Sequence, residues 1–442
     1  MGYKNILGLI ILLSFPVFAQ QKQDAGKENY NFSIKQAIDY ALGHKDSVLN
    51  ARLDEKIAAQ KMREITGLGL PQVNANAEFD QYFDKPITIV PGSFIHSPTD
   101  IAVSFLKTYS TTIGGSFSQL IFDGSYIVGL QAAKTYQQLS TYSTKRTAID
   151  VIASVSKAYY GVVIGAKRIQ ALDINIEKLK KTYEDTKEMN KQGFVEQLDV
   201  QRLEVALNNL EVEKKNSANL ISLTMYLLKF QMGMPIDADL SLTDSLPNSF
   251  PVPAVETVDY KTRIEYKLVN TQKELNLLDM KRNQFGYFPS LVGFGSLSRN
   301  TINDQIDFFG KWYYTGLWGL KLNVPIFDGF QKDARIQQTK LNDLKIQNSM
   351  FTLENGINLQ VRQASLMYQN NYEALEIQKR NLNLAKEIAH VTTIKYQQGV
   401  GTNLELVNAE ADLKTAEINY FSALYDLSVA QIDLQKAKGI LY

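Results

Sequence analysis

The chain has 442 residues, 45% of them hydrophobic, which is enough for two or three ordinary domains. Its 47 basic and 46 acidic residues nearly cancel, so the charge balance argues against a basic surface for nucleic acid. The sequence contains no cysteine, which excludes disulfide frameworks, thiolate metal sites and a lipid-modified N-terminal cysteine.

The first segment, residues 1–19, has a basic residue near its start, then an apolar run, then Val17-Phe18-Ala19. This pattern predicts a secretory signal peptide that is cleaved before Gln20. A membrane anchor would need about 20 apolar residues, and Ser14 and Pro16 interrupt this run. No later stretch is expected to form a transmembrane helix, so we predict an exported protein without a helical span.

Four stretches have strand-like alternation, at 73–83, 105–121, 290–299 and 312–324. The apolar positions of the second stretch match those of the fourth when the two are aligned at an offset of 205 residues. The alternation of 290–299 is broken. We expect each stretch to contain a strand of about ten residues, the length of a transmembrane β-strand. An ordinary half-buried antiparallel sheet would have the same pattern.

Aromatic residues cluster near the ends of these stretches and favour the membrane interpretation, because they resemble the interfacial girdles of outer-membrane barrels. The clusters comprise Phe79, Tyr82, Phe83, Phe285, Tyr287, Phe288, Phe308, Phe309, Trp312, Tyr313 and Tyr314. Four strands cannot close a barrel, and a membrane-spanning sheet cannot leave an open edge. A spanning sheet would therefore need strands from several chains.

The placement of proline predicts two very long helices. No proline occurs between Pro98 and Pro235, or after Pro325. Asp123 and Asp328 occupy positions suited to helix N-caps. Glycine-containing turns follow about 67–69 residues later, which corresponds to roughly 100 Å of helix. A second helix follows each turn.

Two landmarks indicate an internal duplication. Ile-Phe-Asp-Gly occurs at 121–124 and 326–329, and the Gln-Gly turns at 192–193 and 398–399 repeat at nearly the same offset. In each copy we expect Ile and Phe to end a strand, Asp to cap the next helix and Gly to redirect the chain.

The last helix carries two offset heptad seams, which indicates neighbours on two sides. Helices packed along both flanks, with wet inner and outer faces, would make a tube. One seam is Leu404, Val407, Ala411, Lys414, Ile418, Phe421, Tyr425, Ser428 and Ile432. The other is Leu406, Ala409, Leu413, Ala416, Tyr420, Ala423, Leu427, Ala430 and Leu434. A helix buried within a large bundle is the alternative, and the polar residues among 403–412 disfavour it.

Nothing in the sequence supports an exported enzyme. His44, His96 and His390 are isolated, and no phosphate loop or nucleophile elbow is present. We expect no catalytic, cofactor-binding or metal-binding residues.

In the order of its elements the mature chain resembles the TolC-type outer-membrane efflux proteins, also called outer membrane factors. The residues that carry the resemblance are the two Ile-Phe-Asp-Gly joints, the Tyr396–Gly399 turn and LELVNAEADL at 404–413. These motifs are specific for the family and say little about the exported substrate.

The resemblance implies a mainly helical fold with membrane β-structure, built from a duplicated strand–strand–long helix–turn–helix unit. A homotrimer would form one 12-stranded β-barrel in the outer membrane of a Gram-negative bacterium, continued by a periplasmic α-helical barrel. The expected segments are the signal peptide 1–19, a first repeat 20–234, a linker or equatorial segment 235–254 and a second repeat 255–442.

The implied function is a passive exit duct of a tripartite efflux or type I secretion system. Its partners would be a periplasmic adaptor protein, an inner-membrane transporter and outer-membrane lipid, with no cofactor. A structural trimeric coiled-coil stalk or adhesin is the alternative, and it would leave the strand pairs and the duplication unexplained. Which substrate is exported stays open.

The family also implies a gate at the periplasmic tips. An acidic constriction ring maps to Glu405, and its second acidic position is Asn408 in this chain. In a charged latch, the aspartate and tyrosine positions match Asp199 and Tyr396, whereas the arginine position is Gly401. The latch is therefore expected to be incomplete.

Two further sets of residues follow from the resemblance. Adaptor docking maps to the turns Gly193, Phe194, Val195, Gly399, Val400 and Gly401, whose glycines would adopt positive φ. The strand-to-helix joints are Ile121, Phe122, Asp123 and Gly124, and Ile326, Phe327, Asp328 and Gly329.

Overall fold

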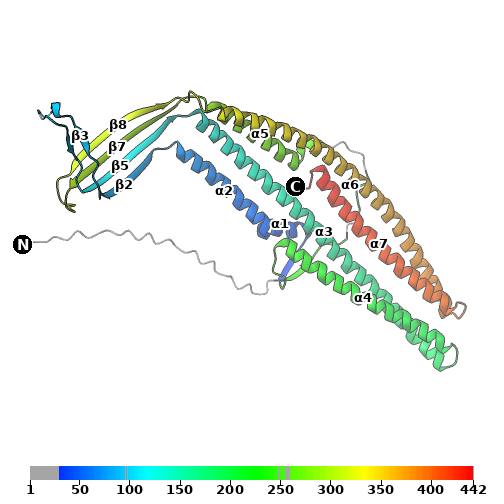
Figure 1. Cartoon of the computed structure of the whole chain (residues 1–442). Coiled ribbons are helices and arrows are strands. Elements are labelled where there is room, and N and C mark those ends of the chain that lie inside the picture. The colour runs from blue at the N-terminus through cyan, green and yellow to red at the C-terminus, as the bar shows by residue number, and fades with distance from the viewer. Residues whose placement is uncertain (1–28, 95, 97, 247–248, 254–258, 442) are drawn as a thin grey trace, which may run out of the picture.

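The computed structural model describes residues 29–94, 96, 98–246, 249–253 and 259–441, and the molecule is strongly elongated (Figure 1). A four-stranded sheet forms one end, and long helices run away from it to two hairpin tips at the other. The predicted signal peptide, residues 1–19, lies outside the described residues.

The four-stranded sheet is antiparallel, with the order β2-β5-β7-β8. Its strands are β2 (Gln72–Gln81), β5 (Tyr109–Phe122), β7 (Ser290–Asn303) and β8 (Tyr313–Asn323). All four predicted strands are confirmed, although β5 and β7 have 14 residues each instead of about ten. β2 and β8 are the edges of the sheet, and neither has a second neighbour among the described residues.

The pairing register divides the side chains of the sheet between an apolar and a polar face. Ile113 aligns with Arg299 and Tyr314, and Phe117 aligns with Gly295 and Trp318, so the parity expected for β5 and β8 is confirmed. The apolar face carries Val73, Phe79, Ile113, Phe117, Leu297, Tyr314, Trp318, Leu320 and Leu322, all exposed in the single chain. The polar face carries Asn74, Asn76, Glu78, Asp80, Ser110, Thr112, Ser116, Ser118, Ser296, Ser298, Asn300, Thr315, Lys321 and Asn323.

The broken alternation of β7 has a structural explanation. Val292 and Phe294 lie on the polar face, opposite Lys321 and Gly319 of β8. A side chain at Gly319 would meet the Phe294 ring, since a Cβ placed there would lie 3.0 Å from its Cζ. The ring therefore occupies space that glycine leaves free.

Short elements surround the main sheet and the helices. A hairpin of β3 (Thr88–Val90) and β4 (Ile101–Val103) extends beyond the sheet, with the one-turn η1 (Gly92–Phe94) between its strands. β1 (Asn29–Phe32) pairs in parallel with β6 (Asp239–Leu242), so the segment between the repeats binds the N-terminal strand near the middle of the molecule. The one-turn η2 (Tyr260–Thr262) precedes the second repeat's first helix.

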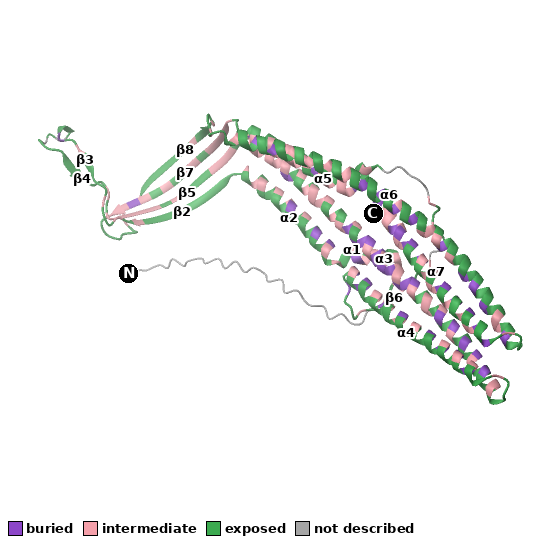
Figure 2. Ribbon diagram, turned by 45° about the vertical axis from the view of Figure 1, so that its right-hand side comes forward, coloured by how far each residue is buried: buried purple, intermediate pink, exposed green. Residues whose placement is uncertain are grey.

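The two predicted long helices are confirmed as α3 (Gly124–Lys191, 68 residues) and α6 (Gln331–Gln397, 67 residues). Each turns back into a 36-residue helix, α4 (Gln197–Met232) or α7 (Asn403–Lys438). The sequence did not predict three further helices, α1 (Ile34–His44), α2 (Asp46–Leu68) and α5 (Ile264–Phe285). Figure 2 shows buried residues along the sides where helices meet, and few in the sheet.

One window of α3 is long and apolar enough to cross a membrane by composition, contrary to the expectation that no such stretch follows the N-terminus. Within the fold, 61% of that window is buried. It includes part of a core of α3, α1 and α4 side chains, among them Val155, Tyr159 and Leu228. The apolar character of α3 is thus explained by helix packing.

The two heptad seams of α7 differ in how far the single chain buries them. Leu406, Ala409, Leu413 and Ala416 of one seam are buried, mostly against α6, as expected. In the other, Ser428 and Ile432 are buried, whereas Leu404 stays 52% exposed. The single chain therefore covers one flank of α7 near its tip and leaves the other partly open.

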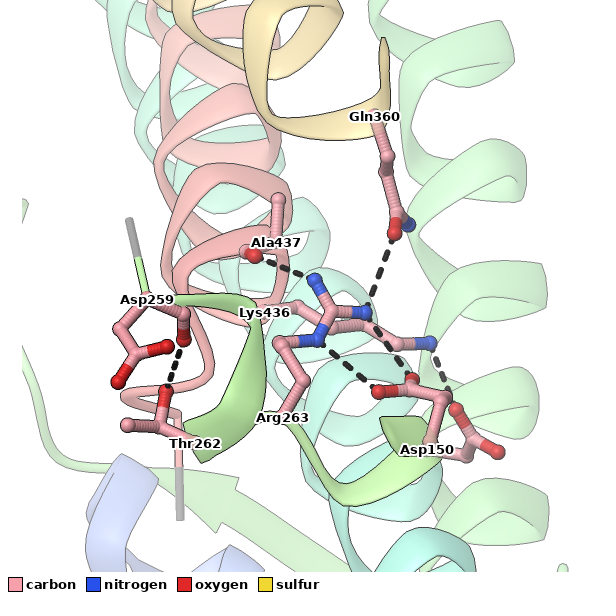
Figure 3. A network of polar contacts seen from close by, with 8 residues as sticks. Asp150, Asp259, Thr262, Arg263, Gln360, Lys436 and Ala437 are labelled. Atoms are coloured by element: carbon pink, nitrogen blue, oxygen red, sulfur yellow. Dashed lines mark hydrogen bonds and ion pairs between the residues drawn. The ribbon is translucent and has the colours of Figure 1, made fainter. Parts of the chain in front are cut away.

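A buried arginine holds the C-terminus of α7 against the start of α5 (Figure 3). Arg263 is 3% exposed, and its guanidinium donates to both carboxylate oxygens of Glu265 at 3.0 Å, to Gln360 at 3.1 Å and to the Ala437 carbonyl. Burial acts to raise the pKa of Glu265, but the Arg263 guanidinium outweighs it and the pKa is lowered. Lys436 adds an ion pair to Asp150 at 2.6 Å.

The first repeat has a weaker version of the same contact. Lys45, at the start of α2, donates to the Phe230 carbonyl of α4 at 3.0 Å, and its ammonium lies 4.0 Å from the centre of the Phe230 ring. In both repeats a cation at the start of one helix binds the carbonyl end of another, where the helix dipole favours positive charge. Gly233 ends α4 and Gly439 ends α7, with positive φ of 72° and 74°.

We predict that Arg263→Met destabilises the helical part by about 3 kcal/mol, because it removes a buried guanidinium and leaves the half-buried Glu265 carboxylate without its partner. Lys45→Met should cost only about 1 kcal/mol, since it removes one hydrogen bond and a cation–π contact. Thermal unfolding of the detergent-solubilised protein, followed by circular dichroism, measures both. Equal effects of the two substitutions would contradict the assigned difference between the repeats.

Candidate functional site

The first strand-to-helix joint connects β5 to α3 without a break. Ile121 and Phe122 end β5, and Asp123 caps α3 by accepting a hydrogen bond from the Tyr126 amide at 2.9 Å. Gly124 is the first helical residue and does not adopt positive φ, contrary to the expected redirecting role. A Cβ on Gly124 would lie 2.7 Å from the Phe285 ring, so glycine here permits close packing of the end of α5.

The second joint differs from the first: Asp328 does not occupy the N-cap position, which is Phe330, but its carboxylate still caps the first turn of α6. β8 ends at Asn323, before Ile326 and Phe327, and α6 begins at Gln331. Gly329 and Phe330 both adopt φ of 65°, which supplies the redirection expected of the glycine. Asp328 instead accepts a hydrogen bond from the Lys332 amide at 3.1 Å and pairs with the Lys332 ammonium at 3.3 Å.

The hairpin tips have matching turn geometry. Gly193 and Gly399 adopt positive φ of 81° and 71°, as expected, whereas Gly401 does not, contrary to the expectation for the turn glycines. The next residues, Phe194 and Val400, donate to Met189 and Lys395 carbonyls at 2.9 and 3.0 Å. Their side chains are 73% and 78% exposed, so each tip presents one apolar side chain to its surroundings.

Behind the tips, a neutral polar cluster joins the two hairpins. The Tyr396 hydroxyl lies 3.0 Å from the Thr186 hydroxyl, and the Asn403 amide donates to the Asp199 carbonyl at 3.1 Å and to the Tyr396 hydroxyl at 3.5 Å. The structure thus brings Asp199 and Tyr396 together, but Asp199 takes part through its backbone. The Asn403 carbonyl oxygen is buried without a partner.

The position of the missing latch arginine is sterically tight. A Cβ on Gly401 would lie 3.0 Å from the Lys395 Cβ and 3.1 Å from the Tyr396 amide nitrogen. The Gly401 amide also donates to the Lys395 carbonyl at 3.1 Å, which tightens the turn. An arginine here would therefore press on the backbone of the turn, and the contact between the hairpins is made by the neutral cluster.

Glu405 and Asn408 lie one turn apart at the start of α7, and both are exposed in the single chain. Glu405 belongs to a capping box with Thr402: its carboxylate accepts from the Thr402 amide at 3.3 Å, and the Thr402 hydroxyl accepts from the Glu405 amide at 3.2 Å. The cap holds the carboxylate at the tip end of the helix.

Two acidic side chains farther along α7 were not singled out from the sequence. Glu417 is 6% exposed and accepts a hydrogen bond from the Asn175 amide of α3 at 2.7 Å. Burial raises the pKa of Glu417 and of Glu410, which lies one heptad nearer the tip. Lys178 attracts both carboxylates and acts against these shifts. Their heptad spacing is the one signal that the sequence offered.

A groove of about 430 Å³ runs between α4 and α7 near the tips. Leu198, Val205 and Val407 supply apolar surface, and Arg202 and Lys414 supply charge. Among the described residues, no group of three or more His, Asp or Glu side chains could hold a metal ion.

We predict that Glu417→Gln makes the helical part more stable at neutral pH. Because the folded-state pKa lies above the ordinary value of 4.5, the protonated acid is favoured by folding. Its stabilisation is complete below the unfolded-state pKa and is lost as pH rises through the folded-state pKa. Glutamine keeps the acceptor for Asn175 without the charge.

The thermal midpoint of Glu417→Gln should therefore exceed that of the unmodified protein at neutral pH, and the difference should shrink at about pH 5. Glu387→Gln, at an exposed position of α6, is the matched control and should change little. A difference that grows on acidification would show that the sign is wrong.

Comparison with known proteins supports the architecture. The family model described as "Outer membrane efflux protein" matches residues 279–439. The toluene efflux pump outer membrane protein TtgC of Pseudomonas putida is 26% identical over 348 residues, which cover 75% of this chain and 69% of that protein. The alkaline protease secretion protein AprF of Pseudomonas aeruginosa is 20% identical, covering 76% and 70% of the two chains.

Solved structures show the same fold. The CmeC outer membrane channel of Campylobacter jejuni aligns with a TM-score of 0.73 and 16% identity, over 92% of this chain and 86% of that one. Together with the family match and the sequence relatives, this fold identifies the chain as a member of the outer membrane efflux protein family, whose TolC-like channels are non-enzymatic transport proteins.

Proposed function

We propose that this outer-membrane efflux channel is a passive exit duct assembled from three copies of the chain. Each copy would contribute four strands to one 12-stranded barrel and four long helices to a tube beneath it. The observation that carries the proposal is the isolated sheet: it has two open edges and an uncovered apolar face, and it continues into helices of 68 and 67 residues.

The sheet edges support assembly into a closed barrel. In hydrocarbon, the unpaired amide and carbonyl groups of β2 and β8 would each cost several kcal/mol. Pairing β2 of one copy with β8 of the next would satisfy them. Two copies would give about eight strands, a barrel whose interior is filled by side chains, whereas three leave room for passage. The polar face would line this interior.

The helices support the same arrangement. Among the described residues, α3 is flanked by α2 and α5 beside the sheet, whereas α6 has α5 on one side and no second flanking helix on the other. Leu68 and Leu70 at the end of α2 are 63% and 57% exposed. Ile326 and Phe327, before α6, are 94% and 74% exposed. The duplication suggests that α2 of one copy packs beside α6 of the next and covers both sets.

The two repeats are proposed as residues 20–234 and 255–442, with 235–254 as the equatorial segment between them. The family match at 279–439 falls within the second. At the tips, we assign Glu405 and Asn408 to the constriction and the Asp199–Tyr396 cluster to the contact that keeps the hairpins together. The closed state would then depend on neutral hydrogen bonds rather than a charged latch.

The proposed partners are a periplasmic adaptor and an inner-membrane transporter. The exposed turns Gly193-Phe194-Val195 and Gly399-Val400-Gly401 offer the adaptor surface, because each presents an apolar side chain at the end of a rigid hairpin. The named relatives serve toluene efflux in one case and alkaline protease secretion in the other. Such a duct would accept what its transporter delivers.

The direct test is reconstitution in a planar lipid bilayer. We expect single-channel conductance from a particle that migrates as a trimer on an unheated gel. A monomer without conductance would contradict the proposal.

Glu405→Gln tests the gate. Three carboxylates ringing the entrance should favour cations and bind divalent cations, so the substitution should weaken both cation selectivity and divalent block. Glu188→Gln is the control, since Glu188 lies near the tip of the other hairpin and pairs with Lys191 at 2.6 Å. Selectivity that is unchanged in Glu405→Gln would remove this residue from the constriction.

A further inference from the structure

The apolar face of the four-stranded sheet carries one charged residue, Arg299. Every other charged side chain within β2, β5, β7 and β8 lies on the polar face: Glu78, Asp80 and Lys321. Arg299 aligns with Ile113 on one side and Tyr314 on the other. A cation on a lipid-facing strand is costly at the middle of a membrane and tolerated at its boundary, so its depth matters.

The length of β7 places Arg299 near the outer boundary. It lies eight positions from Leu291, at the helical end of the strand. Eight residues span about 26 Å along a strand, or about 20 Å across a membrane at the usual tilt. The apolar band of such barrels is about 25 Å tall. The guanidinium is therefore within reach of the headgroups on the side away from the helices.

The surroundings of Arg299 hold it in place without neutralising it. Its guanidinium lies 4.8 Å from the centre of the Trp312 ring, and Trp312 is fixed by donating to the Phe308 carbonyl at 3.2 Å. Among the described residues, no carboxylate forms an ion pair or hydrogen bond with Arg299. Lys85 and Lys107 differ from Arg299 in this respect, because both form ion pairs with Asp304.

We propose that Arg299 and Trp312 form a binding site for an anionic phosphate headgroup of an outer-leaflet lipid. The phosphate would bind the exposed guanidinium, which suits the geometry of phosphate oxygens, and Trp312 would lie at the level of the interface. The acyl chains would follow the apolar face past Leu297 and Trp318, which are 66% and 85% exposed. β7 is an inner strand of the sheet, so the assembly proposed above leaves this position free.

The test uses the two tryptophans of the chain, Trp312 and Trp318. Trp318→Phe leaves Trp312 as the sole tryptophan beside Arg299. The variant is reconstituted in phosphatidylcholine vesicles with brominated phosphatidic acid or brominated phosphatidylcholine as quencher. We expect the site at Trp312 to bind phosphatidic acid about fivefold more strongly than phosphatidylcholine. This factor is what one basic residue near a membrane surface contributes to the binding of an anionic lipid.

In the Trp318→Phe variant, an additional Arg299→Gln substitution should abolish this preference for phosphatidic acid, and Arg299→Lys should retain most of it. Lys321→Gln is the matched control, because it removes one cation from the opposite face of the same sheet. Trimer migration on an unheated gel verifies that each variant assembles. Equal preference in Arg299→Gln and the parent would overturn the site. Loss of the preference in millimolar inorganic phosphate would also overturn it, by showing a site for the free anion.

The inference rests on the proposed membrane barrel, and the reciprocal variant separates their failures. Trp312→Phe leaves Trp318, halfway along the apolar face, as the sole tryptophan. If lipids brominated in mid-chain do not quench Trp318, the membrane placement itself fails. If they quench it but Trp312 shows no preference for phosphatidic acid, the Arg299 site alone is refuted.

Discussion

The need to satisfy backbone hydrogen bonds at the sheet edges determines most of this structure. A four-stranded sheet with one apolar face can lie in a membrane only when β2 and β8 find partners, because hydrocarbon offers none. In the proposed assembly, successive copies provide those partners and thereby enclose the polar face. The same assembly would place the long helices side by side, so that closing the barrel would also form the tube.

The two repeats share this architecture but differ where they join other elements. In the first, Asp123 caps α3 directly and Phe285 packs over Gly124. In the second, Gly329 and Phe330 turn the chain through left-handed backbone before α6 begins. The buried Arg263 contact likewise holds the second repeat more firmly than Lys45 holds the first. The duplicated sequence thus supports one tight and one open joint per chain.

Sequence periodicity predicted the regular elements well. Proline spacing located α3 and α6, and alternation located the four strands, because both signals are local. The N-cap position expected at Asp328 was wrong, since the left-handed Phe330 delays the start of α6 and no local pattern indicates it, but the Asp328 carboxylate still accepts from the Lys332 amide. Thr186 and Asn403 were missed because their contacts with Tyr396 and Asp199 join residues about 200 positions apart. Burial of Glu417 likewise depends on α3, not on α7 alone.

Cysteine cross-linking of the two sheet edges tests the barrel most directly, and the chain has no cysteine of its own. Cysteine at Ala75 of β2 is combined in turn with cysteine at Gly316, Trp318 or Leu320 of β8. We predict that at least one pair gives disulfide-linked dimers and trimers on a non-reducing gel, and that no single variant does. Failure of every pair, while an internal Gly115–Leu297 pair cross-links, would contradict closure of the barrel by neighbouring copies.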